Sequence, residues 1–299
     1  MNSEMISLVY EVFMACTRPL NGWSLPEGGK WHPTPFRGAV PSQVPCGQCI
    51  GCRLARSRSW AVRGQCEASL YERNCFVTLT YSDENLHFTP SGLPTLYRRD
   101  VTLFLKRLRN TGVKFRYFGC GEYGAKFSRP HYHLVIFNHD FDDKVLFRAG
   151  QFPLYVSATL QSLWPHGHSV VAGVSFESIA YTARYCCKKI NGAQADEHYQ
   201  DRDPEMLFCS RNPGIAYDWF IKFYDDVVNT DKVISRGGRA VQPPRVFDKW
   251  LSGCDYEQLL RNKALRLENA RFVDPWRLAD LDRFNEIKFN QMMRKYENG

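Results

Sequence analysis

The sequence predicts an α+β sandwich in which a central antiparallel β-sheet is flanked by helices. Two observations predict this fold. Helix-like and strand-like segments follow in the order helix, strand, helix, strand, strand, helix, strand, helix, and the two adjacent strands are close enough in sequence to pair as a hairpin. The chain has 299 residues, of which 44% are hydrophobic, so it can build a sizeable core.

The first half of this order starts with a helix over 53–71 that carries many arginines. The segment "CFVTLTY" (75–81) is rich in β-branched and aromatic residues, which is typical of a strand. A second helix is predicted over 100–110, where Val101, Phe104, Leu105 and Leu108 recur at helical spacing. We expect Asp100 to cap the start of that helix.

The second half is predicted as strands over 114–124 and 131–137, a helix over 157–164, a strand over 168–174 and a helix over 175–190. Asn191-Gly192 is a natural stop for the last helix. Residues 17–45 are rich in Pro, Gly and Trp and predict an irregular segment, whereas the tail over 255–297 is helical by composition. We therefore expect three parts.

These expected parts are an irregular N-terminal segment (1–52), a central domain (53–225) and a C-terminal helical extension (226–299).

Charge and cysteine content limit the partners and the compartment. The net charge is +8, and the region from Cys46 to Phe118 has 12 Lys and Arg against 5 Asp and Glu, which favours a polyanionic partner. We expect no membrane association, because there is no secretory signal and no apolar run of about 20 residues. The 11 cysteines are an odd number, which favours a reducing compartment with free or metal-bound thiols.

The stretch "RPHYHLVIF" places two histidines on a predicted strand. Residues two apart share a face, so His131 and His133 lie side by side and can bind one divalent metal. Two half-buried structural histidines are the alternative. Glu122 ends the preceding strand, and two histidines with one carboxylate leave coordination positions open for catalysis. His139 competes with Glu122 if the strand extends that far, but the glycines beside Glu122 favour the carboxylate.

The stretch "YTARYCCKK" places Tyr181 and Tyr185 one helical turn apart on one face. Lys188 follows three residues after Tyr185 and can help a phenol lose its proton or neutralise a phosphoryl group. This favours Tyr185 as the more readily activated tyrosine. The alternative is a helix that packs two aromatic side chains into the core and ends in lysines for reasons of the helix dipole.

A cysteine cluster and a basic helix come before these motifs. The segment "CGQCIGC" spaces Cys46, Cys49 and Cys52 for a zinc site, which Cys16 could complete. Buried free thiols and an iron–sulfur cluster are the alternatives. The arginines that follow predict contacts with DNA phosphates, with a solvated helix face as the alternative, and they are Arg53, Arg56, Arg58 and Arg63. Trp60 could stack on a base or pack in the core.

Together these motifs resemble the HUH endonucleases, and more closely the rolling-circle replication initiators of microviruses of the gokushovirus type. "FVTLTY" resembles the first motif of that family, "RPHYHLVIF" the second and "YTARYCCKK" the third. The segments "MACTRPLNGW", "PCGQCIGCR", "SRNPGIAYDWF" and "PPRVFDKW" also resemble gokushovirus initiators, so the resemblance spans nearly the whole chain. The sequence departs from the family at residues 1–13, which precede the usual start, and at Tyr132, where the family has an apolar residue.

The resemblance implies a nickase and ligase that acts on single-stranded origin DNA. It implies that Mg²⁺ or Mn²⁺ on His131, His133 and Glu122 polarises the scissile phosphate. A tyrosine then forms a 5′-phosphotyrosine, and the free 3′-OH primes a host DNA polymerase. The second tyrosine allows the ends to be rejoined into a circle. Because no G-x-x-x-x-G-K-[ST] sequence occurs, we expect a host helicase as partner, in the cytoplasm of a bacterial host.

Two other readings remain from the residues. A mobilisation relaxase or single-strand transposase would use the same chemistry. A non-catalytic, zinc-dependent DNA-binding protein would use His131 and His133 only as structural residues.

Overall fold

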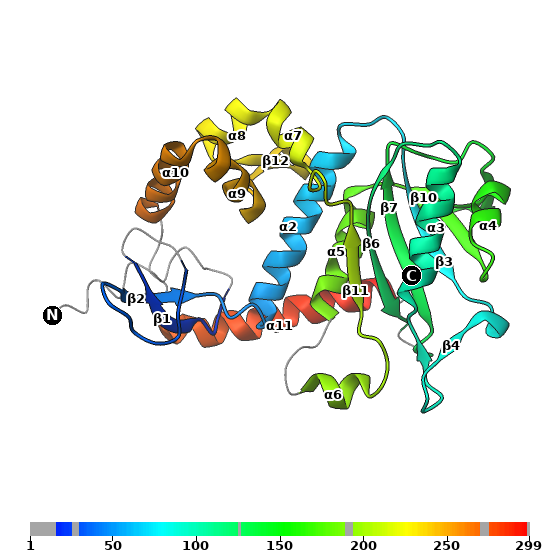
Figure 1. Ribbon diagram of the computed structural model, residues 1–299, viewed down its shortest axis with the longest axis horizontal. Coiled ribbons are helices and arrows are strands. Elements are labelled where there is room, and N and C mark those ends of the chain that lie inside the picture. Colours follow the sequence, from blue (N-terminus) through cyan, green and yellow to red (C-terminus); the bar gives the residue numbers. More distant parts are fainter. Residues whose placement is uncertain (1–15, 26–29, 125–126, 189–193, 270–274, 298–299) are drawn as a thin grey trace. The chain divides into compact units, whose positions relative to one another are not determined.

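The computed structural model describes residues 16–25, 30–124, 127–188, 194–269 and 275–297 (Figure 1). Its contacts divide the chain into two compact units. The sheet unit is continuous, Ser57–Phe247, and the terminal unit combines Met1–Arg56 with Asp248–Gly299. Helices α2 (Ile50–Ala68) and α9 (Arg245–Cys254) each run across a boundary between the units.

The sheet unit is built on a seven-stranded sheet in which every neighbouring pair is antiparallel. The strands follow across the sheet in the order β11 (Met206–Cys209), β6 (Arg116–Tyr123), β7 (Pro130–Phe137), β3 (Asn74–Thr80), β10 (Ser169–Gly173), β9 (Leu154–Val156) and β8 (Val145–Arg148). The predicted α+β fold with a central antiparallel sheet is confirmed. The sequence patterns had indicated β3, β6, β7 and β10, but not the other three strands.

Strand β7 is held on both sides. It forms the predicted hairpin with β6, in which Glu122 pairs with His131. On its other edge it pairs with β3, where Thr78 lies opposite His133. β7 is buried from Tyr132 to Phe137. A strand paired on both edges gives its side chains fixed positions, which a functional site requires.

Helices cover both faces of the sheet (Figure 1). On one face, α3 (Arg98–Asn110) and α4 (Ala158–Leu163) bury Phe104 and Leu160 with Leu134 of β7. On the other face, α5 (Phe176–Lys188) lies against β6, β7 and β11 and buries Ile179 with Val135. Side chains alternate along a strand, so the odd-numbered residues of β7, including both histidines, lie on the α5 side.

Helix α2 approaches α5 closely at Gly64. A Cβ atom at Gly64 would lie 2.4 Å from Cγ2 of Ile179, which is too close for any substituent. The branch of an isoleucine is fixed near its backbone and cannot easily move away. Gly64 therefore sets how near α5 lies to α2.

The expected capping role of Asp100 is wrong. Helix α3 begins at Arg98 with Tyr97 at the N-cap position, and Asp100 lies buried in the first turn. Its carboxylate accepts a hydrogen bond from the hydroxyl of Tyr81 at 2.9 Å and lies 2.7 Å from Nε2 of His87. A buried hydroxyl needs a partner, so Asp100 satisfies Tyr81 rather than the helix end.

The sheet unit also contains short elements that the sequence patterns did not indicate. They are η2 (Asp83–Asn85), β4 (His87–Phe88), β5 (Pro94–Thr95), α6 (Gln194–Tyr199), α7 (Tyr217–Lys222), α8 (Tyr224–Thr230), β12 (Val233–Ser235), η3 (Arg236–Gly238) and β13 (Arg239–Val241). Each has between 2 and 7 residues, which is too few for hydrophobic periodicity to be read.

The terminal unit contains a small hairpin and helices. Strand β1 (Leu20–Ser24) pairs with β2 (Val40–Val44), so the expectation of a wholly irregular segment over 17–45 is wrong. Gly22 explains the hairpin, because a Cβ there would lie 2.3 Å from the Trp31 ring, and no alternation of side chains announced it. The helical tail is confirmed as α10 (Tyr256–Glu268) and α11 (Pro275–Glu297). None of the described helices is both long and apolar enough to cross a membrane.

Candidate active site

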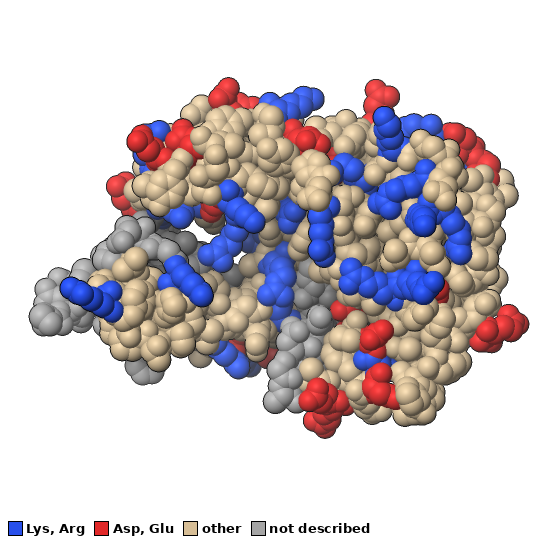
Figure 2. Space-filling view, viewed as in Figure 1, with Lys and Arg blue, Asp and Glu red and all other residues tan. Residues whose placement is uncertain are grey.

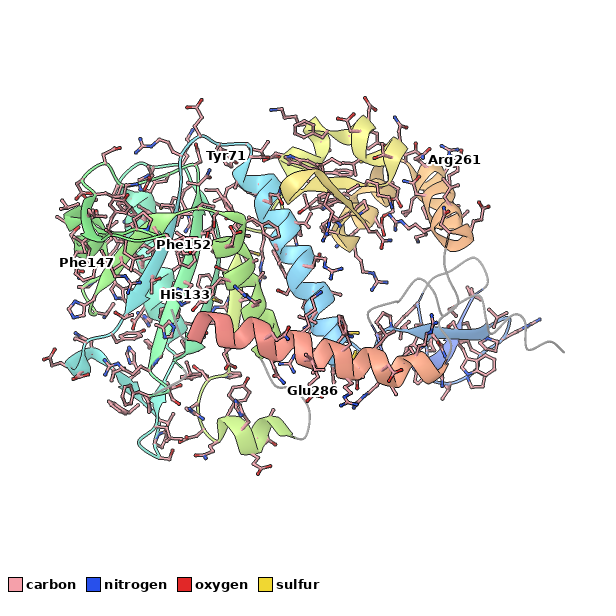
Figure 3. All side chains as sticks on the ribbon, turned by 180° about the vertical axis from the view of Figure 1, so that it is seen from behind. Tyr71, His133, Phe147, Phe152, Arg261 and Glu286 are labelled. Carbon is pink, nitrogen blue, oxygen red and sulfur yellow. The ribbon has the colours of Figure 1, made fainter. Side chains whose placement is uncertain are left out.

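The β6–β7 hairpin brings the three predicted metal ligands together on the α5 side of the sheet. Glu122 pairs directly with His131, and His133 is two residues further along the same strand. Glu122 and His133 are buried, whereas the side chain of His131 is 17% exposed. The group is therefore accessible from the side of His131. Figure 3 shows His133 among the side chains of the sheet.

The three side chains converge on one oxygen atom. Nε2 of His131 lies 2.8 Å from Oε1 of Glu122, and Nε2 of His133 lies 3.0 Å from the same oxygen. Neighbouring ligand atoms around an octahedral cation with bonds of roughly 2.1 Å are also roughly 3.0 Å apart. The triad of Glu122, His131 and His133 therefore fits one small divalent cation and leaves its other coordination positions open.

The far side of each imidazole is held by a hydrogen bond. Nδ1 of His131 lies 3.0 Å from the backbone carbonyl of Arg129, which can only accept, so Nδ1 carries the proton. Nδ1 of His133 lies 3.0 Å from the hydroxyl of Thr78. Such outer bonds fix ring orientation and turn the Nε2 lone pair toward a metal. Thr78 lies within the "FVTLTY" segment, but the sequence did not identify this role.

The carboxylate of Glu122 is ionised at neutral pH despite its burial. Burial raises the pKa of Glu122, but hydrogen bonds and charge interactions with His131 and His133 outweigh that effect and hold the pKa at about 2. A carboxylate must be deprotonated to bind a metal. Glu122 is thus in the protonation state that a ligand needs.

Tyr181 approaches the triad from helix α5. Its hydroxyl lies 3.5 Å from Oε1 of Glu122, and its ring meets the ring of His133 edge-on, with centroids 5.0 Å apart. Phe76 of β3 contacts the same ring. The backbones of Tyr185 and Lys188 belong to α5, but their side chains lie outside the described part of the chain.

Arg184 is a further cation beside Tyr181. It is buried, and its guanidinium carbon lies 5.6 Å from the centre of the Tyr181 ring. A nearby positive charge favours the ionised form of a phenol. The sequence analysis did not single out Arg184, although residues three apart on a helix share a face and the spacing from Tyr181 was readable.

His139 is not part of the triad, which decides the competition for the third ligand in favour of Glu122. Strand β7 ends at Phe137, and Asn138 has a φ of 63°, in the left-handed region. This turn breaks the alternation on which the expectation rested. His139 packs against Phe141 instead, with ring centroids 4.9 Å apart.

The four predicted cysteines form a second cluster, in the terminal unit. The Sγ atoms of Cys16, Cys46, Cys49 and Cys52 all lie within 4.8 Å of one another. Cys16 lies 3.8 Å from Cys46 and 4.0 Å from Cys49. Four sulfurs around a tetrahedral ion with bonds of roughly 2.3 Å are roughly 3.8 Å apart. The cluster therefore has the dimensions of a four-thiolate metal site.

Hydrogen bonds polarise these sulfurs. Backbone amides donate to Sγ of Cys16, Cys46 and Cys49 at 3.3 to 3.4 Å. A hydrogen bond from Cys52 is the main cause that lowers the pKa of Cys49 to about 4, and the same bond raises the pKa of Cys52. A thiolate is the form of cysteine that binds metals.

The arginines predicted to contact DNA differ in their surroundings. Arg58 is exposed. Arg56 is exposed and donates to the backbone carbonyl of Gly47 at 3.0 Å, and the guanidinium of Arg53 lies 5.7 Å from the Phe289 ring centre. On the right-hand part of Figure 2, Lys and Arg side chains form bands across the surface and Asp and Glu lie mainly at its rim.

Arg63 and Trp60 belong to the interior of the sheet unit. Nε of Arg63 donates to the backbone carbonyl of Ile215 at 3.2 Å, and its guanidinium carbon lies 4.0 Å from the Trp60 ring centre. Trp60 in turn stacks on Phe118 of β6, with centroids 4.8 Å apart. The arrangement favours the core alternative for Trp60.

Comparisons with known proteins agree with the site. The family model for replication-associated proteins of the ORF2 type matches residues 74–190, which contain the triad and Tyr181. The replication-associated protein ORF2 of Spiroplasma virus 4 is 33% identical over 261 residues, which are 79% of this chain and 80% of that protein. The replication-associated protein VP4 of Bdellovibrio phage phiMH2K is 33% identical over 69% of this chain and 66% of its own.

The replication-associated protein ORF4 of Chlamydia phage 1 is 28% identical over 66% of this chain and 50% of its own. No solved structure matches the chain. The extent of the match to the Spiroplasma virus protein, together with the family model over the site, shows that this chain belongs to the replication-associated proteins of microviruses, the rolling-circle replication initiators of these phages.

Proposed function

We propose that the protein nicks single-stranded origin DNA with a tyrosine nucleophile and later rejoins the ends. The observation that carries this proposal is the position of the Tyr181 hydroxyl, 3.5 Å from Oε1 of Glu122 within a group of two histidines and one carboxylate. A nucleophile beside an open cation site is the arrangement that phosphoryl transfer to a side chain needs.

The triad would hold Mg²⁺ or Mn²⁺. Such an ion, when bound, polarises the phosphoryl oxygen and stabilises the charge that builds up on it. The residues of the chain supply the rest. Thr78 and the Arg129 carbonyl orient the imidazoles. Tyr181 presents its oxygen to the phosphate, and the Arg184 charge beside the ring favours the phenolate.

The proposed cleavage conserves the energy of the phosphodiester. The Tyr181 oxygen forms a bond to phosphorus while the bond from phosphorus to the 3′ oxygen breaks. The phenol loses its proton, and the departing 3′ oxygen becomes a free 3′-OH. Because a phosphodiester to tyrosine replaces a phosphodiester to sugar, no ATP is needed when a 3′-OH later attacks the adduct and closes a circle.

Tyr185 is the proposed second nucleophile. It follows Tyr181 by four residues on α5, so the two positions share one helical face. Two tyrosines on one face allow a second cleavage while the first adduct is still in place. We assign Lys188, one turn further, to the charge of the phosphoryl group.

The four-cysteine cluster is proposed to hold a structural Zn²⁺. Four thiolates without an open position are typical of structural zinc rather than of a catalytic ion. The sulfur spacing and the amide donors to three of the four sulfurs support this proposal.

The partners that follow are DNA and host proteins. Arg53, Arg56, Arg58 and Arg63 would contribute positive charge next to the DNA, although the surroundings favour Arg58 most. We place the nuclease domain at residues 53–225. The 3′-OH would be extended by a host polymerase and the strands separated by a host helicase, in the bacterial cytoplasm.

The test uses labelled single-stranded oligonucleotides that tile the genome of the phage carrying this gene. Wild-type protein with Mn²⁺ or Mg²⁺ is expected to cleave one of them and to retain its 5′ end in a complex that survives a denaturing gel. EDTA, His131→Ala and His133→Ala should each abolish the complex. His139→Ala is the matched control, because this histidine follows the same strand but lies outside the triad. Full cleavage by the double variant of His131 and His133 would refute the catalytic role.

A further inference from the structure

Helix α11 of the terminal unit has one half-buried face. Leu278, Leu281, Asp282, Asn285 and Phe289 are half-buried and recur at helical spacing, whereas Arg283, Phe284, Glu286, Ile287 and Lys288 are exposed. Figure 3 marks Glu286 on this helix. A single covered stripe means that α11 is held along one side only.

Two contacts on that stripe come from residues next to the cysteine ligands. The hydroxyl of Thr17, which follows Cys16 directly, donates to Oδ1 of Asp282 at 2.7 Å, and Arg18 donates to Oδ2 at 2.8 Å. Arg53 follows Cys52 directly and places its guanidinium over the ring of Phe289.

The positions of these contacts match the geometry of the helix. Asp282 and Phe289 are seven residues apart, which is two helical turns, so they lie on the same face. The first is held by the segment that begins at Cys16 and the second by the start of α2. These two segments are far apart in the sequence, and the cysteine cluster is where they meet.

The strength of the contacts depends on this meeting point. The side chain of Arg18 is 76% exposed, and an exposed ion pair contributes little to stability by itself. Thiols are weak hydrogen-bond partners, so sulfur contacts alone hold Cys16 loosely to the other three cysteines. A metal bound by four thiolates, in contrast, contributes directly to folding.

We propose that metal binding by Cys16, Cys46, Cys49 and Cys52 holds helix α11 in place, so that α11 is released when the metal is removed. The inference rests on the zinc site proposed above and adds what that site controls. The metal joins the segment of Thr17 and Arg18 to the segment of Arg53, and only the joined pair presents both contacts to Asp282 and Phe289.

Hydrogen–deuterium exchange of the full-length protein, read by mass spectrometry, tests this proposal. Removal of zinc with the chelator TPEN is expected to speed exchange of the amides of residues 277–291 by at least about fivefold. Added Zn²⁺ should restore protection. Peptides from β3 and β7 serve as an internal reference and should keep their exchange rates, since their strands belong to the sheet unit.

A second arm leaves the metal in place. Asp282→Asn is expected to speed exchange over 277–291 by about fivefold while zinc content stays at one equivalent, because it weakens the bonds from Thr17 and Arg18. Asp280→Asn is the matched control on the exposed side of the helix and should leave exchange unchanged. If metal removal unfolds the whole chain, this arm alone decides.

Unchanged exchange over 277–291 after zinc removal, or in Asp282→Asn, would overturn the proposal. Elemental analysis that finds no bound metal would overturn the zinc site and the proposal together. Neither result would touch the proposed nicking activity, which is measured separately on single-stranded DNA.

Discussion

The hydroxyl of Tyr181 and Oε1 of Glu122 lie 3.5 Å apart, although 59 residues separate them in the sequence. One belongs to helix α5 and the other to strand β6, and the packing of α5 on the sheet brings them together. The nucleophile and the ligands are therefore positioned by separate elements. Variants of either element, and of the contacts between them, can be tested separately.

Tyr181→Phe removes the hydroxyl and keeps the ring that packs on His133 and Phe76. We expect this variant to form adducts only through Tyr185, and the double variant with Tyr185→Phe to form none. The single variants should cleave but not release closed circles. Peptide mapping of the DNA-linked residue after a denaturing gel gives the readout, with the exposed Tyr256→Phe as control. An adduct in the double variant would contradict the two-tyrosine mechanism.

Thr78→Val keeps the shape of the side chain but removes the hydroxyl beside Nδ1 of His133. We expect Mn²⁺ to bind about tenfold more weakly, because the imidazole loses the bond that orients it. Titration of Mn²⁺ followed by electron paramagnetic resonance measures the affinity. Thr80→Val is the matched control, since its hydroxyl donates to the carbonyl of His168 instead. Equal affinities for the two variants would show that Thr78 does not position the ligand.

Glu122 makes the stability of the metal-free protein depend on pH. Its pKa is about 2 in the folded protein against a model value of 4.5, so the folded pKa is depressed. The stabilisation is present above pH 4.5 and is lost as the pH falls toward 2. With EDTA present, wild type should lose about 3 kcal/mol over this range that Glu122→Gln does not lose.

Urea unfolding at pH values from 6 down to 2 measures this difference in slope. Glu84→Gln changes an exposed carboxylate near strand β3 and should follow the wild type. Parallel pH profiles for wild type and Glu122→Gln would mean that the imidazoles do not stabilise the carboxylate.

Gly64→Ala is expected to destabilise the protein by about 1 to 3 kcal/mol, because the added methyl group overlaps Ile179. Adding Ile179→Ala removes the overlap, so the double variant should be more stable than the sum of the two single effects. Thermal unfolding of all four proteins completes the cycle. Gly173→Ala is the control, since a Cβ there meets no atom within 4 Å. Additive effects would rule out steric contact between these two positions.

Arg58 and Arg63 should separate DNA affinity from stability. Arg58→Ala is expected to weaken binding to all single-stranded sequences alike and to reduce the salt dependence by about one phosphate contact. Arg63→Ala should mainly lower the melting temperature, because it breaks contacts with Trp60 and the Ile215 carbonyl. Fluorescence anisotropy against salt and thermal unfolding measure the two effects. A reversed pattern would place Arg63, rather than Arg58, at the DNA.

The local patterns of the sequence predicted much of the sheet and of the triad. Alternation along β7 placed His131 and His133 on one face, and the short link to β6 made a hairpin that brings Glu122 beside them. These predictions rest on geometry that repeats every two residues and does not depend on distant parts of the chain. The same reasoning predicted the helices that flank the sheet, but not strands as short as β8, β9 and β11.

The sequence by itself thus determined the secondary structure that carries the motifs, the shared face of the two histidines and the candidate roles of the cysteines and tyrosines. The tertiary structure alone decided which of these candidates meet. It brought Tyr181 to Glu122, joined Cys16 to cysteines 30 and more residues away, and placed Arg63 against Trp60 inside the sheet unit. The physical reason is that periodicity records which face a residue occupies, whereas the partner across that face is chosen by the packing of elements distant in the sequence, as Gly64 and Ile179 illustrate.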